Sequence, residues 1–155
     1  MRVAVALQGD HDVERRLHAL PRRIRASVAA TLTRLGYGLL SEVVDRKLNG
    51  EVLQRRSGKL AASQTLVIED DGFAVSVGFD DRAVPYGRFQ EFGVPHSWLI
   101  EAKKARALRF SIDGKTLFRK RVTHPPLPAR SFLRSALRDF EPLVAPTIAT
   151  AIANP

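Results

Sequence analysis

The sequence predicts an α+β protein in which a mainly antiparallel sheet packs against a long N-terminal helix and a C-terminal helix. Apolar residues recur every three or four positions from Val13 to Val43, which is typical of a helix with one buried stripe. Two pairs, Asp71-Gly72 and Asp113-Gly114, each lie between two strand-like segments. Hairpins of this kind build antiparallel sheets, and an amphipathic helix covers one face of such a sheet.

The 155 residues are enough for one domain with a hydrophobic core. We expect that core in residues 1–93 and 126–141, with a projecting arm of residues 94–125 and a C-terminal tail of residues 142–155. The chain has no cysteine, which excludes disulfides and thiol chemistry. No apolar run approaches the ~20 residues that span a bilayer, and the N-terminus lacks the features of a signal peptide. We therefore expect no membrane partner.

The N-terminal third is predicted to hold one strand and two helices. Arg2–Gln8 alternates apolar and polar residues, as a strand does. A short helix then runs to about Ala19 and a long one from Pro21 to Leu48, because proline is tolerated in the first turn of a helix. Gly36 and Gly38 each weaken a helix by ~1 kcal/mol, so they indicate a kink or a close neighbour.

A polar and basic segment follows the long helix, which Asn49-Gly50 is expected to end. In this segment we expect Ser57 to cap a single helical turn that carries Leu60. The pair Gly58-Lys59 lacks the spacing of a phosphate-binding loop, which excludes that motif.

Two hairpins supply most of the predicted sheet. Thr65–Phe79 forms the first, closed by a type I′ turn at Asp71-Gly72. Alternation gives this hairpin one buried face, formed by Phe73, Val75, Val77 and Phe79. The second joins Leu108–Ile112 to a strand from Thr116 to Val122 through Asp113-Gly114.

A short helix is predicted between the hairpins, beginning at Pro85 and ending at Gly93. It carries Tyr86, Phe89 and Phe92 on one side. We interpret these rings as core anchors, because large apolar side chains are usually buried. The alternative interpretation is an aromatic platform that stacks on nucleic-acid bases.

The C-terminal part begins with a rigid extended connector, His124–Pro128, since its prolines can continue neither a helix nor an inner strand. Ser131 is then predicted to cap a helix. The side chains expected to face the core are Phe132, Leu133, Leu137 and Phe140. Pro142 and Pro146 are expected to interrupt this helix. The tail beyond them packs either on a neighbouring subunit or back on its own core.

The net charge of +9 is concentrated on the second hairpin. Between Lys103 and Arg121 there are eight cations and only one acid, Asp113, which gives a net charge of +7. The candidate interface residues are Lys103, Lys104, Arg106, Arg109, Lys115, Arg119, Lys120, Arg121 and Arg130. Such a patch favours DNA or an acidic protein surface as partner. The alternative is a solubilising face on a protruding hairpin.

Catalytic motifs are missing from the sequence. The four histidines are scattered and have no cysteine partners, so no zinc site is expected. Nucleophile-elbow, metalloprotease and dinucleotide-binding motifs do not occur. The acidic segments Glu69–Asp71 and Asp80-Asp81 lie at strand ends, where aspartate is favoured for local bonding. A metal-dependent nuclease built on these acids is a third hypothesis. We expect no enzyme, no metal and no cofactor.

Several short segments resemble one known family. They are Arg56-Ser-Gly-Lys-Leu-Ala-Ala-Ser63, Tyr86-x-x-Phe-Gln-Glu-Phe-Gly93, Lys103-Lys-Ala-Arg-Ala-Leu-Arg-Phe110 and Leu127-Pro-Ala-Arg-Ser-Phe-Leu-Arg-Ser-Ala-Leu137. In their order and spacing they resemble the tail-completion proteins of tailed bacteriophages, in the minor tail and virion morphogenesis families. The likeness covers roughly residues 56–137. The family usually has proline at the position of Ser131 and threonine near Val94, so the local turn geometry cannot be carried over.

The resemblance implies a structural subunit without catalysis or cofactor, acting in a ring at the head–tail junction. The implied partners are other copies of the chain, as a hexamer or another cyclic oligomer, and the neighbouring head-completion and tail-tube proteins. Non-specific contact with packaged DNA is a further expectation. The implied location is the neck or tail of the virion, and the host cytoplasm during assembly. The competing hypothesis is a basic nucleic-acid-binding domain that uses the Lys103–Arg121 hairpin, with Tyr86 or Phe110 stacking on bases.

Overall fold

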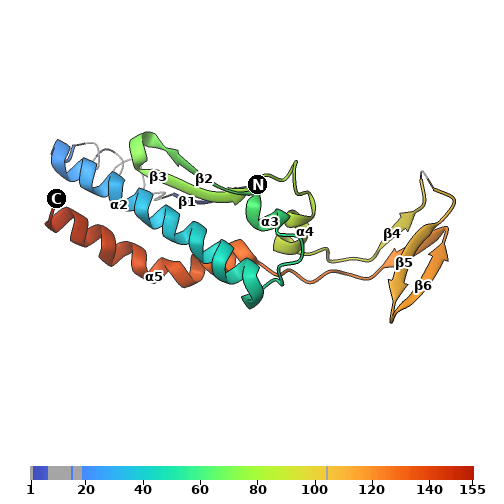
Figure 1. The fold of residues 1–155 in the computed structure, drawn as a ribbon. Helices are drawn as coiled ribbons and strands as arrows, with labels where there is room; N and C mark the ends of the chain where they lie inside the picture. The colour runs from blue at the N-terminus through green and yellow to red at the C-terminus, as the bar shows by residue number, and fades with distance from the viewer. Residues whose placement is uncertain (1, 7–14, 16–18, 104) are drawn as a thin grey trace.

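The computed structural model describes residues 2–6, 15, 19–103 and 105–155. The molecule is elongated, with a body of helices and sheet and a thin arm that projects from one end (Figure 1). The predicted α+β class is confirmed, with a long N-terminal helix, a C-terminal helix and antiparallel strands. The predicted short helix before Ala19 lies outside the described residues.

The body contains a three-stranded antiparallel sheet in the order β1-β3-β2. Its strands are β1 (Arg2–Ala6), β2 (Gln64–Glu69) and β3 (Ala74–Phe79). The first predicted hairpin is therefore confirmed, and so is the N-terminal strand over Arg2–Ala6; the last two residues of its predicted range lie outside the described residues. The turn at Asp71-Gly72 has positive φ at both residues, and Phe73 N donates to Asp70 O at 2.9 Å, as a type I′ turn requires. The alternating face of β3 is buried, as predicted.

The long helix covers one face of this sheet. It comprises α2 (Arg22–Ser41) and a more widely wound continuation, η1 (Glu42–Glu51), and it ends at Asn49 and Gly50, where the backbone leaves helical geometry. The predicted range is confirmed. Its buried stripe packs on the hydrophobic side chains of β2 and β3; the central members are Val28, Leu32, Leu39, Val43, Val75, Val77 and Phe79.

The two glycines of α2 mark close neighbours. A Cβ atom added to Gly36 would lie 2.3 Å from Val75 Cγ1, so the helix approaches β3 more closely than any side chain allows. A Cβ atom on Gly38 would lie 3.0 Å from the ring of Phe140. Of the two predicted explanations, close packing is the one that the structure supports.

The C-terminal helix, α5 (Phe132–Ala153), runs antiparallel to α2 along the body (Figure 1). The predicted interruption is wrong, because α5 continues through Pro142 and Pro146. Both prolines are exposed, so water can satisfy the carbonyl groups that lose a helical partner. The predicted tail is therefore the second half of α5. It packs back on the chain's own α2, where Ser27 Oγ donates to Ala151 O at 3.0 Å.

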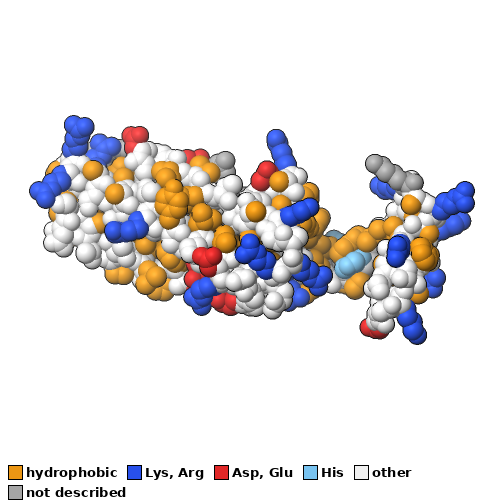
Figure 2. Space-filling view, in the orientation of Figure 1, with side chains coloured by type: hydrophobic (Ala, Val, Ile, Leu, Met, Phe, Trp, Pro, Cys, Tyr) orange, Lys and Arg blue, Asp and Glu red, His pale blue; other side chains and the backbone are white. Residues whose placement is uncertain are grey.

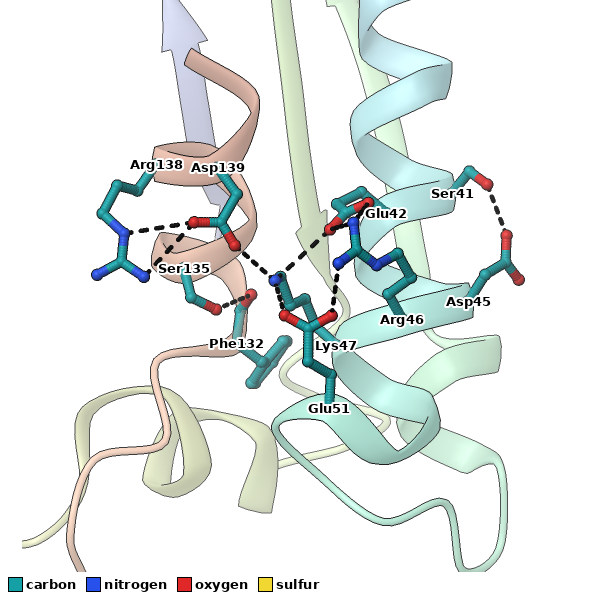
Figure 3. A network of polar contacts seen from close by, with 10 residues as sticks. All are labelled: Ser41, Glu42, Asp45, Arg46, Lys47, Glu51, Phe132, Ser135, Arg138 and Asp139. Atoms are coloured by element: carbon teal, nitrogen blue, oxygen red, sulfur yellow. Dashed lines mark hydrogen bonds and ion pairs between the residues drawn. The ribbon is translucent and has the colours of Figure 1, made fainter. Parts of the chain in front are cut away.

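An ion-pair network fastens η1 to α5 (Figure 3). Its centre is Lys47, whose side chain is almost fully buried. Lys47 Nζ lies 2.6 Å from Asp139 Oδ2 and also donates to Glu51. Burial by itself would lower the pKa of Lys47, but the hydrogen bonds to Asp139 and Glu51 outweigh it and raise that pKa. The same bonds hold the pKa values of both carboxyl groups below their usual range.

Candidate functional site

The arm is one long hairpin that is interrupted in the middle. Near the body β4 (Trp98–Glu101) pairs with β7 (Arg121–His124), and at the tip β5 (Leu108–Ile112) pairs with β6 (Lys115–Arg119). On the returning side a single residue, Lys120, separates β6 from β7, and the two pairs form separate ribbons. The predicted hairpin at Asp113-Gly114 is confirmed, with positive φ at both turn residues.

Two details of that prediction are corrected. The predicted strand Thr116–Val122 is divided at Lys120, whose carbonyl accepts a bond from Ala102 N at 3.0 Å. The second hairpin also forms its own ribbons and does not join the sheet of the body. The reason lies in the extended connectors, residues 93–97 and 125–131, whose prolines carry the chain away from β3 before it pairs again.

The arm has no core of its own. Among the described residues from Gly93 to Ser131, none is buried. Large apolar side chains remain in the open on the strands, including Ile112 at 53% and Phe118 at 58% exposure. An isolated two-stranded ribbon is marginally stable in water, and exposed apolar groups of this size are typical of a surface that another molecule covers.

Cations surround these apolar side chains without forming a separate basic face. The register places Arg109 opposite Phe118 on one face of the ribbon, and Lys115 opposite Ile112 on the other. Figure 2 shows the same mixture, with blue cationic and orange apolar side chains alternating over the arm. The described cations of the predicted interface on the arm are Lys103, Arg106, Arg109, Lys115, Arg119, Lys120 and Arg121. Lys104 lies outside the described residues.

A buried carboxylate fixes the base of the arm. Glu91 of α4 (Tyr86–Phe92) is fully buried and accepts bonds from the backbone N–H of Leu133 at 2.8 Å and of Arg134 at 3.2 Å. The Arg134 guanidinium completes the site, since its Nε lies 3.0 Å from Glu91 Oε1 and its Nη2 donates to Glu91 O at 2.8 Å. Glu91 therefore caps α5 and is paired at the same time.

The two connectors are also tied to each other. Val94 and Leu127 exchange backbone hydrogen bonds of 2.7 and 2.9 Å. Gly93 lies just before this bridge with φ +71°, and a Cβ atom there would lie 2.5 Å from Leu127 O. Together with the Glu91–Arg134 pair, this bridge forms a junction that sets the direction in which the arm leaves the body.

The predicted core anchors divide into two groups. Phe132 and Leu133 are buried, as predicted. The prediction for Tyr86, Phe89 and Phe92 is wrong, since 43%, 52% and 48% of these side chains are exposed. Helix α4 begins and ends where the sequence predicts, but its inward side is formed by two other positions.

Those inward positions explain the rotation of α4. Gly87 lies against Phe79 so closely that a Cβ atom would come within 2.5 Å of the ring, and Glu91 reaches the start of α5. The aromatic side is left facing outward. There Phe92 is covered on one side by the Arg134 guanidinium, 5.0 Å from the ring centroid.

The prediction that Ser131 caps the C-terminal helix, α5, is wrong. Ser131 has a left-handed backbone and makes no cap bond; its Oγ donates to Glu91 O at 3.3 Å. The true cap, Glu91, precedes the helix by about forty residues. No local pattern reveals it, because capping motifs are recognised within a few residues of a helix start.

The acidic segments do not converge on a metal site. Asp71 and Asp80 flank opposite ends of β3, and the described residues contain no group of three or more histidine or acidic side chains that could hold a metal ion. Of the helices described, none has the length and apolar character needed to cross a membrane.

No family profile, curated protein or solved structure matches this chain. The assignment of a function therefore depends on the arm, its junction and the sequence motifs at that junction.

Proposed function

We propose that this chain is a structural subunit of a tailed-bacteriophage virion, a tail-completion protein that forms a ring at the head–tail junction. The observation that supports the proposal is the projecting arm, which exposes apolar side chains and whose described residues include no buried one. A subunit of a heterologous ring needs a surface of this kind, because it closes the ring by binding a different surface of the next copy.

The positions of the motifs also support this proposal. The segments Tyr86–Gly93 and Leu127–Leu137, on which the family resemblance mainly rests, are far apart in the sequence but meet at the junction. Glu91 of the first binds Arg134 of the second, and Val94 beside the first binds Leu127. The residues of these two segments are therefore accounted for by a structural role, which is to set the direction in which the arm leaves the body. None of them needs a catalytic role.

The arm is the part to test. Replacing Ile112 and Phe118 by serine removes two exposed apolar groups, and Tyr37→Ser on α2, with 58% exposure, is the matched control. We expect native mass spectrometry and electron microscopy to show a ring, in the purified protein or in tails, for the unchanged chain and for Tyr37→Ser. The double variant is expected to lose the ring while keeping its helical circular dichroism.

A second test concerns assembly in infected cells. In cells that lack the protein we expect unjoined heads and tails to accumulate, and the double arm variant to reproduce that defect. Normally joined particles in the absence of the protein would overturn the proposal. No catalytic activity and no cofactor form part of it.

The density of charge on the arm favours one alternative, a nucleic-acid-binding function. Under this alternative, binding to DNA falls steeply with salt, because phosphate contacts release counterions. Replacing Arg119, Lys120 and Arg121 by alanine would then weaken binding and reduce the salt dependence. Weak binding near physiological salt that these replacements leave unchanged would reject the alternative. The mixture of apolar and cationic side chains on both faces of the ribbon favours a protein surface.

A further inference from the structure

A cavity of about 610 Å³ lies beside the junction, in the body. It is an open cleft lined by the end of η1, the short helix α3 (Lys59–Ala62), α4 and the return connector. Its size is within the ~300–1,000 Å³ typical of ligand clefts. The apolar part of its lining is Leu48, Val52, Leu53, Leu60, Ala61, Tyr86 and Leu127.

Three arginines, Arg55, Arg56 and Arg130, are the charged residues of this lining, which contains no acidic residue. All three are exposed, and within the described part of the chain none forms an ion pair. Other arginines of the body do find carboxylates, as Arg46 and Arg134 show. Guanidinium groups bind carboxylates through paired hydrogen bonds, so the cavity has an apolar floor with an uncompensated positive rim.

The aromatic side of α4 extends this surface. Tyr86 lines the cavity, and Phe89 follows one turn later, about half exposed. Aromatic residues and arginine are enriched at protein–protein interfaces, where a large ring supplies contact area at small entropic cost. Figure 2 shows cationic side chains gathered where the body meets the connectors. Charge and apolar contact are therefore available side by side.

We propose that this cavity, which we call the arginine cleft, binds an extended acidic segment of a different protein through carboxylates and one large apolar side chain. Like charge excludes the basic arm of a second copy. The chain's own exposed acidic segment, Glu69–Asp71, lies at a tight turn, so an extended acidic segment has to come from another molecule. A short cleft with apolar side chains and three cations suits a peptide better than a nucleic-acid backbone, which needs a track of phosphate contacts.

The cleft uses none of the strands β4–β7 of the arm, only Leu127 and Arg130 of the return connector, so failure of the ring test and failure of the peptide test are distinguishable. The experiment is to select binders of the purified full-length chain from a yeast-displayed library of short random peptides. We expect the enriched peptides to combine aspartate or glutamate with a large apolar residue. Their affinity, measured by fluorescence anisotropy, is expected to fall about tenfold for each cleft arginine reversed in Arg56→Glu and Arg130→Glu.

The controls separate the cleft from general electrostatics. Arg34→Glu, an exposed position on α2, changes the net charge equally and is expected to leave the affinity nearly unchanged. Because the cleft arginines are exposed and unpaired, their reversal should not alter the far-ultraviolet circular dichroism. Tyr86→Ala is expected to weaken binding without abolishing the charge dependence.

Several results would overturn the inference. Peptides enriched without acidic residues, or an affinity equally reduced by Arg34→Glu, would remove the role of the cleft. A single-stranded oligonucleotide that displaces the peptides more effectively than they displace one another would identify a nucleic-acid site. Self-association that is lost in Arg56→Glu would identify a second copy of the chain as the occupant.

Discussion

Replacing Glu91 by alanine is the most direct test of the junction. The carboxylate is fully buried and accepts two backbone N–H bonds at the start of α5 as well as the bond from Arg134 Nε. Alanine leaves both N–H groups without their acceptor, and it leaves the guanidinium without its counterion. Since Arg134 is about half exposed, water can compensate the charge, but the first turn of α5 has no substitute cap.

The expected loss follows from these contacts. Hydrogen bonds to a charged group contribute about 1.5–3 kcal/mol each, and loss of a helix cap costs about 0.5–2 kcal/mol. Because these contributions overlap, we expect the free energy of unfolding to fall by about 3 kcal/mol for Glu91→Ala. A domain of this length loses roughly 2–4 °C of melting temperature per kcal/mol, which gives a decrease of about 6–12 °C.

The measurement is urea and thermal unfolding followed by far-ultraviolet circular dichroism. Glu91→Gln keeps the shape and one acceptor oxygen, so it should fall between the wild type and Glu91→Ala. The matched control is Glu141→Ala, an exposed position on α5, which should change stability by less than about 0.5 kcal/mol. Equal stability of Glu91→Ala and Glu141→Ala would show that the junction does not hold the fold together.

Three further predictions follow from the same contacts. Trp98, the single tryptophan, lies on the arm, so its fluorescence should change at lower urea than the helical signal, because the arm has no buried core; coincident transitions would contradict this. Gly36→Ala should lower the free energy of unfolding by about 1–3 kcal/mol, because the added methyl group clashes with β3. In Gly38→Ala the cost of shifting the facing Phe140 ring should nearly cancel the gain from the higher helix propensity of alanine. Similar losses in the two variants would refute the packing assignment. Because the pKa values of Asp139 and Glu51 are lowered in the folded state, their contribution to stability is present above pH ~4 and is lost as the pH falls further. In Lys47→Met the urea midpoint of unfolding should therefore decrease less steeply with falling pH than in the wild type. An unchanged pH dependence of that midpoint would count against the network.

Much of the local structure could be predicted because its signals are local. Asp71-Gly72 and Asp113-Gly114 both adopt the positive φ that their turns need. Gly50 and Gly93 end helices with positive φ for the same reason. Such signals depend on one or two residues and on sterics that are the same in every fold.

Predictions that depended on burial were less reliable. The spacing of Tyr86, Phe89 and Phe92 shows that they share a side of α4, but the side that faces inward is set by Gly87 and Glu91. Large rings usually take the buried side, yet here that side carries a close backbone approach and a capping carboxylate. The sequence pattern gives the period of a helix and not the contacts that orient it.

The sequence located the candidate site only as a region of the chain, and the structure divides that region into the arm, the junction and the arginine cleft. The charge count identified the arm, and the motifs identified its two ends. The sequence grouped Arg130 with the arm cations, but it lies apart from them. Its backbone N–H donates to Gln90 O at 2.7 Å, and its side chain lines the arginine cleft. No feature of the sequence places Arg55 and Arg56 beside it, because they are more than seventy residues away along the chain.

The sequence by itself determined most of the elements and their order, the turns and the concentration of charge on one hairpin, although it did not predict β4. Each of these depends on interactions between residues close together in the chain, so composition and spacing suffice. Tertiary structure alone decided that the second hairpin leaves the sheet, that α5 continues through Pro142 and Pro146, and that Glu91 caps a helix about forty residues further on. These features depend on which surfaces meet and where water reaches the backbone, and contacts between distant segments leave no signal in the spacing of neighbouring residues.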